Sequence, residues 1–260
     1  MPEQAVLDEN WSPTVRTLFL RYYPEYSDHR FADLLDQHIH PTAHVLEIGA
    51  GSGRNNQNHF NLRGKVARYV GIDPDKNILT NPFLDEGFQA NAHSLPFADG
   101  AFDLVFHHYV AEHFRSPLPS NREIARVLKP GGLLLFQTPN RYYYASVIAS
   151  LTPQWFHEFY VRRFASGRTS QEVFPTFYRM NDARTIARQL KTCDFIYDIQ
   201  YHTLPPGYLR FSRVSFMAGV LFERTMERWF PPLRGTITVI ARKNSSSNPE
   251  RVNFQLYHSE

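Results

Sequence analysis

The stretch from Val45 to Arg54 constrains the fold of this 260-residue chain more than any other. Its first residues, Val-Leu-Glu-Ile, have the composition of a short buried strand, and Gly49, Gly51 and Gly53 follow at alternate positions. Glycine adopts positive φ angles without strain and has no Cβ, so a ligand can approach the backbone of such a turn closely. A helix after the turn would direct its free N–H groups toward the same ligand. The stretch therefore predicts a strand, a turn and a helix around a ligand site.

Two features separate this turn from a dinucleotide site. The dinucleotide fingerprint is G-x-G-x-x-G, whereas here Arg54 follows the third glycine directly. Glu47, at the end of the strand, would repel a pyrophosphate and suits a ligand with a cationic amine. A nicotinamide dehydrogenase is therefore disfavoured, and the stretch resembles motif I of the class I S-adenosylmethionine (SAM) dependent methyltransferases. The resemblance implies cofactor contacts from Glu47, Gly49, Ala50, Gly51 and Gly53.

A second acidic residue follows the next predicted strand. Residues 67–72 form that strand, and Asp73 and Pro74 come directly after it, twenty residues beyond Gly53. In a Rossmann-like crevice, an acid at the tip of the second strand accepts hydrogen bonds from the ribose hydroxyls. An aspartate at the start of a loop also serves as a simple turn former. The resemblance favours the ribose role for Asp73 and places Pro74 beside it.

Two further motifs extend the resemblance to about residues 40–140. Residues 91–105 are similar to the family segment D-A-x-x-L-P-F-x-D-x-x-F-D-x-V, whose acid and alanine N–H address the adenine edge. Asn91 replaces that acid, and an amide can both accept a hydrogen bond from an exocyclic amine and donate one. The resemblance thus implies that Asn91 and Ala92 contact adenine. The sequence L-K-P-G-G at 128–132, ahead of an apolar run typical of a strand covered on both faces, is the other match.

The resemblance and the length together predict one α/β domain over residues 1–260. We expect a Rossmann-like, seven-stranded, mostly parallel sheet with helices on both faces. Residues 1–40 are expected to form an N-terminal helical cover, residues 141–180 an aromatic-rich helical lid, and residues 244–260 a tail.

Composition and residue patterns indicate which compartment, partners and metal sites to expect for this protein. Cys193 is the single cysteine, so an internal disulfide is excluded, which suits a reducing compartment. No apolar run is long enough to span a bilayer, and no signal-peptide pattern opens the chain, so we expect a cytoplasmic protein. The net charge of +3 is weaker than in a dedicated nucleic-acid binder, and no nucleic-acid partner is expected; the oligomeric state stays open. His38, His40 and His44 lie across a predicted helix end and need not converge, so we expect no metal site.

Local patterns also predict how several helices begin and pack. Ser120 and Glu123 match a capping box, which predicts a helix start at Ser120. Asn181 is expected to cap a later helix. Between two predicted strands, at residues 195–202 and 236–242, an amphipathic helix is expected to present its apolar face at Val214, Met217 and Leu221.

Four residues near the strand ends are candidates for catalysis, because ligands in open α/β sheets bind beyond the carboxyl ends of the strands. His108, and also His107, could act as a general base, since a neutral imidazole is suited to that role near pH 7. His107 is also a candidate contact of the cofactor, and a packing role is the alternative for each histidine. Asn140 could hold the acceptor or the methionyl amine. Tyr178 could contact the sulfonium, because an aromatic face attracts a cation by roughly 0.5–2 kcal/mol.

Three functions remain open on these residues. The first is methyl transfer from SAM to a small-molecule acceptor, such as a hydroxyl of a sugar or natural-product intermediate, with S-adenosylhomocysteine as product. The second is cyclisation of SAM by its own methionyl amine, which would give azetidine-2-carboxylate and 5′-methylthioadenosine. The third is a SAM-binding module without turnover.

Overall fold

The computed structural model describes residues 12–23, 27–53, 60–144, 146–147, 175–206, 209 and 211–245, with only the backbone of residues 27–29. The helix expected directly after Gly53, most of the predicted lid and nearly all of the predicted tail lie outside these residues.

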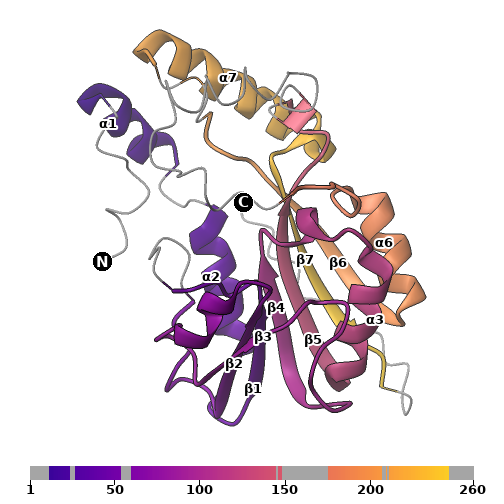
Figure 1. Ribbon diagram of the computed structural model, residues 1–260. Coiled ribbons are helices and arrows are strands. Elements are labelled where there is room, and N and C mark those ends of the chain that lie inside the picture. Colours follow the sequence, from indigo (N-terminus) through magenta and orange to yellow (C-terminus); the bar gives the residue numbers. More distant parts are fainter. Residues whose placement is uncertain are drawn as a thin grey trace.

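A seven-stranded sheet forms the centre of the molecule, with strand order β3-β2-β1-β4-β5-β7-β6 (Figure 1). The strands are β1 His44–Ile48, β2 Arg68–Asp73, β3 Glu86–Gln89, β4 Phe102–His108, β5 Leu128–Pro139, β6 Phe195–His202 and β7 Thr236–Lys243. Strands β1 to β5 pair in parallel, and β7 runs antiparallel to both of its neighbours, β5 and β6. The predicted Rossmann-like, mostly parallel sheet is confirmed. The strand order reverses between β1 and β4, and open α/β sheets bind ligands at such a point.

Helices cover both faces of the sheet. One face carries α2 (Ser27–His38), which buries Phe31 and Leu35. The other carries α3 (Pro117–Val127) and α6 (Ala183–Thr192) (Figure 1). Each fully buried aliphatic or phenylalanine side chain contributes about 1.5–3 kcal/mol relative to an exposed one. Both faces of β1 and β4 are therefore held by core packing, which fixes where their carboxyl ends lie.

A separate pair of helices stands over the carboxyl edge of the sheet, and we call this pair the cap. It consists of α1 (Pro13–Tyr22) and α7 (Arg213–Trp229), seen at the top of Figure 1. Their contact forms a small core of Val15, Phe19, Phe216 and Val220, separate from the two cores of the sheet. Short 3-10 turns complete the edge: η2 Lys76–Thr80, η3 Ala111–His113 and η6 Pro231–Leu233. In the described part of the chain, no helix combines the length and apolar character needed to cross a bilayer.

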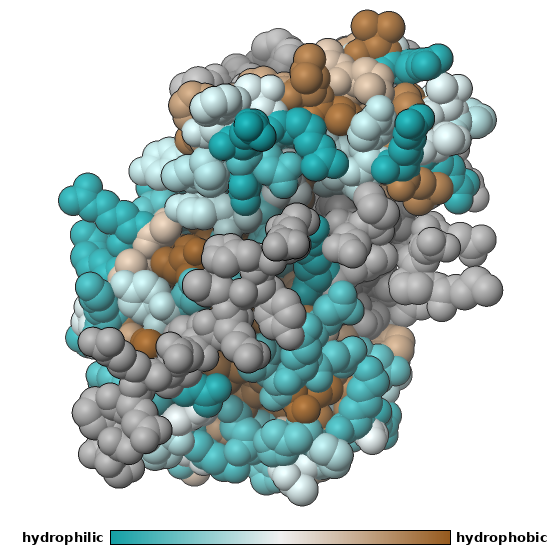
Figure 2. Space-filling model, turned by 180° about the vertical axis from the view of Figure 1, so that it is seen from behind, coloured by the Kyte–Doolittle hydropathy of each residue, from teal (hydrophilic) through white to brown (hydrophobic). Residues whose placement is uncertain are grey.

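The predicted packing face of α7 is wrong, although the helix itself is present. Val214 is 79% exposed and Leu221 is 70% exposed. The helix instead buries Phe216, Val220 and Glu223. Hydrophobic side chains accordingly appear on the outer surface of the cap in Figure 2. The α7 sequence carries more than one apolar stripe at helical spacing, and tertiary contact with α1 decides which stripe is buried.

Two predicted helix caps are also wrong. Helix α3 begins at Pro117, whose fixed φ suits a first helical position, and Ser120 lies inside it. The carboxylate of Glu123 accepts a hydrogen bond from Leu95 N at 2.8 Å and pairs with a guanidinium, so no capping box forms. Asp182, not Asn181, caps α6 by accepting from the backbone N–H of residue 185.

Candidate active site

The glycine turn after β1 has the geometry that its sequence predicts. Gly49, Gly51 and Gly53 have φ angles of +77°, +58° and +71°, in the left-handed region that favours glycine. The backbone N–H of Gly49 donates to Ile72 O at 2.8 Å, which holds the turn against the end of β2. A Cβ on Gly49 would lie 2.4 Å from Val110 Cγ2. Position 49 therefore requires glycine both for its conformation and for space.

Asp73 joins the end of β2 to this turn. Its carboxylate is buried and accepts hydrogen bonds from the backbone N–H groups of Gly51, at 3.1 Å, and Asp75, at 2.8 Å. Burial raises the pKa of Asp73, and the two N–H donors oppose that rise. A carboxylate has about four acceptor positions, so further donors such as ribose hydroxyls can still be accommodated. Pro74, next in the chain, is exposed and accepts from Gln89 Nε2 at 2.9 Å.

Glu47 lies on β1, on the face of the sheet that α2 covers. The hydroxyl of Tyr69, on the adjacent strand, donates to its carboxylate. Burial raises the pKa of Glu47 to about 7; the charge of Asp73 adds to that rise and the Tyr69 hydrogen bond opposes it. A cation brought close would favour the ionised carboxylate. Glu47 thus has the electrostatic character expected of a partner for an amine.

Asn91 and Ala92 follow β3 and reach the same edge as Asp73. The backbone N–H of Ala90 donates to Asp73 O at 3.0 Å, which ties the two strand ends together. The carbonyl of Asn91 accepts from Ser94 N, and its side chain is exposed. Ala92 packs against the sheet core. The structure thus brings the ends of β1, β2 and β3 together, as the motif order predicts.

His107 and His108 point to opposite faces of the sheet, because successive strand residues alternate. The His107 ring is fully buried and stacks on Phe136 at 4.6 Å between centroids. Burial lowers the pKa of His107 to about 3, and the nearby charge of His108 adds to this. Within the described residues, neither ring nitrogen of His107 has a hydrogen-bond partner. His108 instead packs between Phe31 and Phe60, at 5.1 and 5.2 Å. The two histidines therefore do not converge.

Asn140 and Tyr178 occupy different positions at the end of β5. The Asn140 side-chain amide donates to Pro232 O and Arg234 O, both at 2.8 Å, and its oxygen accepts from Tyr142 N. In this arrangement the Asn140 side chain holds the turn after β5 to the segment before β7. Tyr178 is half-buried with φ +50°, and its backbone N–H donates to the carbonyl of residue 112.

A buried polar network beside these residues was not predicted. Thr138 Oγ1 donates to the carboxylate of Glu112 at 3.1 Å and accepts from Asn181 Nδ2 at 2.6 Å. Burial raises the pKa of Glu112. The network joins the loop after β4, the end of β5 and the start of α6 beneath Tyr178. Its signal in the sequence is an acid in the loop that follows a buried strand, a position at which only the histidines drew attention.

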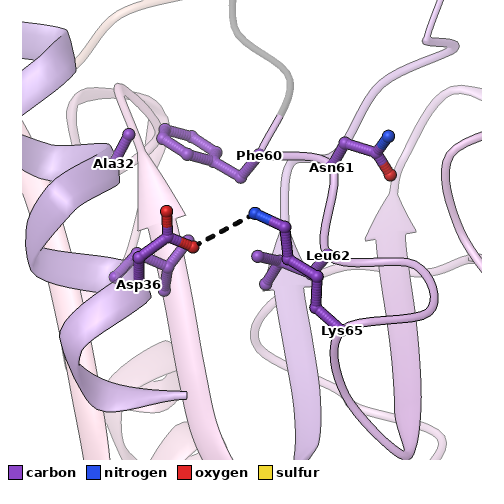
Figure 3. Close-up of a pocket in the computed structure, with 7 residues that line it drawn as sticks. Ala32, Asp36, Phe60, Asn61, Leu62 and Lys65 are labelled. Atoms are coloured by element: carbon purple, nitrogen blue, oxygen red, sulfur yellow. Dashed lines mark hydrogen bonds and ion pairs between the residues drawn. The ribbon is translucent and has the colours of Figure 1, made fainter. Parts of the chain in front are cut away.

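A hollow of about 210 Å³ lies between α2 and residues 60–65 (Figure 3). An ion pair between Asp36 and Lys65, at 3.3 Å, crosses it. None of its lining residues comes from the glycine turn or from the carboxyl end of a strand, so it is separate from the site described above. Among the described residues, no group of three histidine, cysteine, aspartate or glutamate side chains is arranged to hold a metal ion.

The similarity to known proteins falls in the same region of the chain as the site described above. Residues 46–136 match the family described as a methyltransferase domain. An uncharacterized methyltransferase of Mycobacterium sp. (strain KMS) is 39% identical over 93 residues, which cover 34% of this chain and 36% of the relative. The ubiquinone/menaquinone biosynthesis C-methyltransferase UbiE of Hahella chejuensis is 35% identical over 103 residues, or 36% of this chain and 41% of the relative.

The solved structures extend the likeness in fold. A putative sarcosine dimethylglycine methyltransferase from Galdieria sulphuraria superimposes with a TM-score of 0.53 and 16% identity, over 90% of this chain and 99% of that one. The chain aligns with 36% and 41% of the length of these two curated relatives. The matched residues contain the glycine turn, Asp73, Asn91 and both histidines, but neither helix of the cap.

Proposed function

We propose that this chain, which belongs to the class I SAM-dependent methyltransferase superfamily through residues 46–136, transfers the methyl group of SAM to a small-molecule acceptor. The observation that carries the proposal is the joining of the glycine turn to Asp73 at the point where the strand order reverses. The products are S-adenosylhomocysteine and a methylated acceptor, for which a hydroxyl of a sugar or natural-product intermediate is our candidate.

The residues present fit SAM. The space around a Cβ at Gly51 is open, and glycine leaves it unfilled, so a ligand can approach the backbone of the turn there. The buried carboxylates of Asp73 and Glu47 suit the two ends of SAM that carry hydrogen-bond donors, the ribose and the methionyl amine. Asn91 and Ala92 would address the adenine. When bound, SAM supplies an electrophilic methyl carbon on a sulfonium.

The contribution of the protein to such a transfer is placement and exclusion of water, which lower the barrier without covalent chemistry. Tyr178 is our candidate for contact with the sulfonium, since its backbone is anchored at the loop after β4. His107, with its low pKa, is neutral at pH 7 and a weak base, so we assign it a hydrogen-bonding role. His108 remains our candidate for the general base. Asn140 is our candidate for a residue that holds the carboxyl edge of the sheet in position.

Cyclisation of SAM is the second candidate function, and Glu47 favours it. Its pKa of about 7 would allow it to take a proton from the methionyl amine. The free amine would then form a bond to its own Cγ as the C–S bond breaks, which releases 5′-methylthioadenosine. No second substrate is needed for this reaction.

Chromatography of the nucleosides after incubation of the full chain with SAM separates these functions. With a panel of hydroxyl and amine acceptors, methyl transfer predicts S-adenosylhomocysteine that depends on the acceptor. Formation of methylthioadenosine from SAM alone would contradict methyl transfer and support cyclisation. If SAM binds tightly but stays unchanged, the result would support a SAM-binding module without turnover. Asp73→Ala should remove the product in either reaction, whereas the exposed neighbour Asp75→Ala should retain it.

A further inference from the structure

A buried glutamate interrupts the packing face of the cap. Glu223, on α7, is only 1% exposed and follows Phe216 and Val220 on the side of the helix that faces α1. A carboxylate almost never occupies such a position without a partner. Its sequence signal is an acid seven residues after Phe216 and three after Val220, the spacing of one helix face.

Tyrosines from two distant segments surround Glu223. The hydroxyl of Tyr143 donates to Glu223 Oε1 at 2.7 Å, and the Tyr144 ring packs 4.5 Å from the Tyr143 ring. Tyr23 lies at the end of α1, close enough for the Glu223 charge to raise its pKa after the larger effect of burial. Its hydroxyl is buried and has no hydrogen-bond partner among the described residues. The cluster therefore contains both an ionisable carboxyl group and an unused polar group.

No cation balances the charge of Glu223 within the described part of the chain. The neighbouring Arg224 donates to Tyr22 O at 3.1 Å and to Glu227 at 3.2 Å, so its guanidinium is engaged elsewhere. Burial raises the pKa of Glu223 to about 7, and the tyrosines only partly oppose this. A buried carboxylate is stabilised when a cation with hydrogen-bond donors reaches it.

The cluster lies next to the carboxyl edge. The backbone N–H of Tyr143 donates to Asn140 O at 3.1 Å, directly beyond β5, and α7 stands over the same edge (Figure 1). Asn140 in turn holds the segment that connects α7 to β7. A ligand at Glu223 would thus sit between the cap and the carboxyl edge of the sheet, the edge at which Asp73 lies.

We propose that Glu223 binds an ammonium group of the methyl acceptor, with the rings of Tyr23, Tyr143 and Tyr144 beside it, and hence that the acceptor is a small amine. The inference rests on the proposed methyl transfer. An ammonium would supply the missing cation, and contact with the aromatic rings would add about 0.5–2 kcal/mol. Because an ammonium nitrogen has no lone pair, this contact anchors the acceptor and a different atom, such as a hydroxyl oxygen, receives the methyl group.

Matched pairs of amines and alcohols test the proposal. Glucosamine with glucose, and 2-phenylethylamine with 2-phenylethanol, would be titrated by calorimetry into the full chain saturated with S-adenosylhomocysteine. We expect at least one amine to bind about tenfold or more tightly than its alcohol, because charge-assisted hydrogen bonds are stronger than neutral ones. Glu223→Gln should remove that preference, and Glu227→Gln, one turn further along α7 with its side chain 38% exposed, should keep it.

Folding and cofactor binding serve as controls. Glu223→Gln retains an acceptor for the Tyr143 hydroxyl, so its melting temperature at pH 5, where Glu223 of the folded chain is protonated, and its S-adenosylhomocysteine affinity should match those of the natural chain. Tyr23→Phe should weaken amine binding severalfold, because it removes the hydroxyl that the ligand would engage. Equal binding of amines and alcohols, no binding of any amine, or an undiminished preference in Glu223→Gln would overturn the inference and leave methyl transfer standing. Failure of S-adenosylhomocysteine to bind would overturn both.

Discussion

Glu47 and Glu223 are two buried glutamates with similar surroundings in two different regions of the molecule. Each accepts a hydrogen bond from a tyrosine, and burial raises the pKa of each to about 7. Glu47 lies on β1, which is paired with a neighbouring strand on each side. We call Glu47, the glycine turn and Asp73 together the floor of the proposed cofactor site. Glu223 lies in the cap, on a helix whose outer side is exposed.

The difference lies in how each site is assembled. Around Glu47, the glycine turn and Asp73 come from short segments whose residues read as motifs. Around Glu223, the groups come from positions 23, 143–144 and 223, which only the tertiary fold brings together. The cofactor site that we propose is thus encoded by short contiguous segments, whereas the acceptor site that we propose depends on the packing of the cap.

The largest effect is expected in the floor, at Gly49. Gly49→Ala would strain a left-handed residue, at about 1–2 kcal/mol, and force its Cβ onto Val110, at about 1–3 kcal/mol more. Gly51→Ala has the same kind of φ but open space around its Cβ, so only the first cost applies. Urea unfolding of both variants would measure this. Equal losses would show that the contact with Val110 does not restrict the turn.

Asp73→Ala comes next and separates the floor from the cap. Loss of hydrogen bonds to a carboxylate should weaken S-adenosylhomocysteine binding roughly 10- to 100-fold, an effect of about 1.5–3 kcal/mol. Glu223→Gln should leave that affinity unchanged. Calorimetry on both variants would check this, with Asp75→Ala as the control. A comparable loss in Glu223→Gln would contradict the division into two sites.

The pH dependence of stability probes the two glutamates themselves. The folded chain keeps the proton on Glu47 up to about pH 7, whereas the unfolded chain releases it near pH 4.5. The folded state binds more protons between these values, so its contribution to stability falls as the pH rises through that window. Glu47→Gln should flatten the decline by roughly 1–3 kcal/mol. Glu223→Gln should flatten it in the same direction. A steeper decline in either variant would reverse the assigned sign.

The smallest effect is expected from the tyrosine that holds Glu223. Tyr143→Phe removes a donor to a buried carboxylate and should lower the free energy of unfolding by about 1–2 kcal/mol at pH 8, where Glu223 is ionised. Tyr142→Phe, at a 54% exposed neighbour, should stay within about 0.5 kcal/mol of the natural chain. Thermal unfolding of both variants would check this prediction. A smaller loss for Tyr143→Phe at pH 5 would show that the hydroxyl stabilises mainly the ionised carboxylate.

The sequence predicted most of the sheet and the conformation of the glycine turn because both depend on local signals. Apolar runs identified the strands, and glycine spacing identified the turn whose φ angles the structure has. Packing decisions were harder to predict. The buried stripe of α7 and the engagement of Glu123 by Leu95 depend on partners distant in sequence. The hydrogen bonds of the Asn140 side chain were equally hard to predict, because its partners lie more than ninety residues away in the sequence.

Calorimetric titration of the full chain with S-adenosylhomocysteine is the most direct test of the central claim, that the glycine turn and Asp73 hold a sulfur nucleoside at the carboxyl edge of the sheet. We predict saturable binding that is retained in Glu223→Gln and strongly weakened in Asp73→Ala. Absence of heat with both SAM and S-adenosylhomocysteine, or binding that Asp73→Ala leaves intact, would contradict the claim.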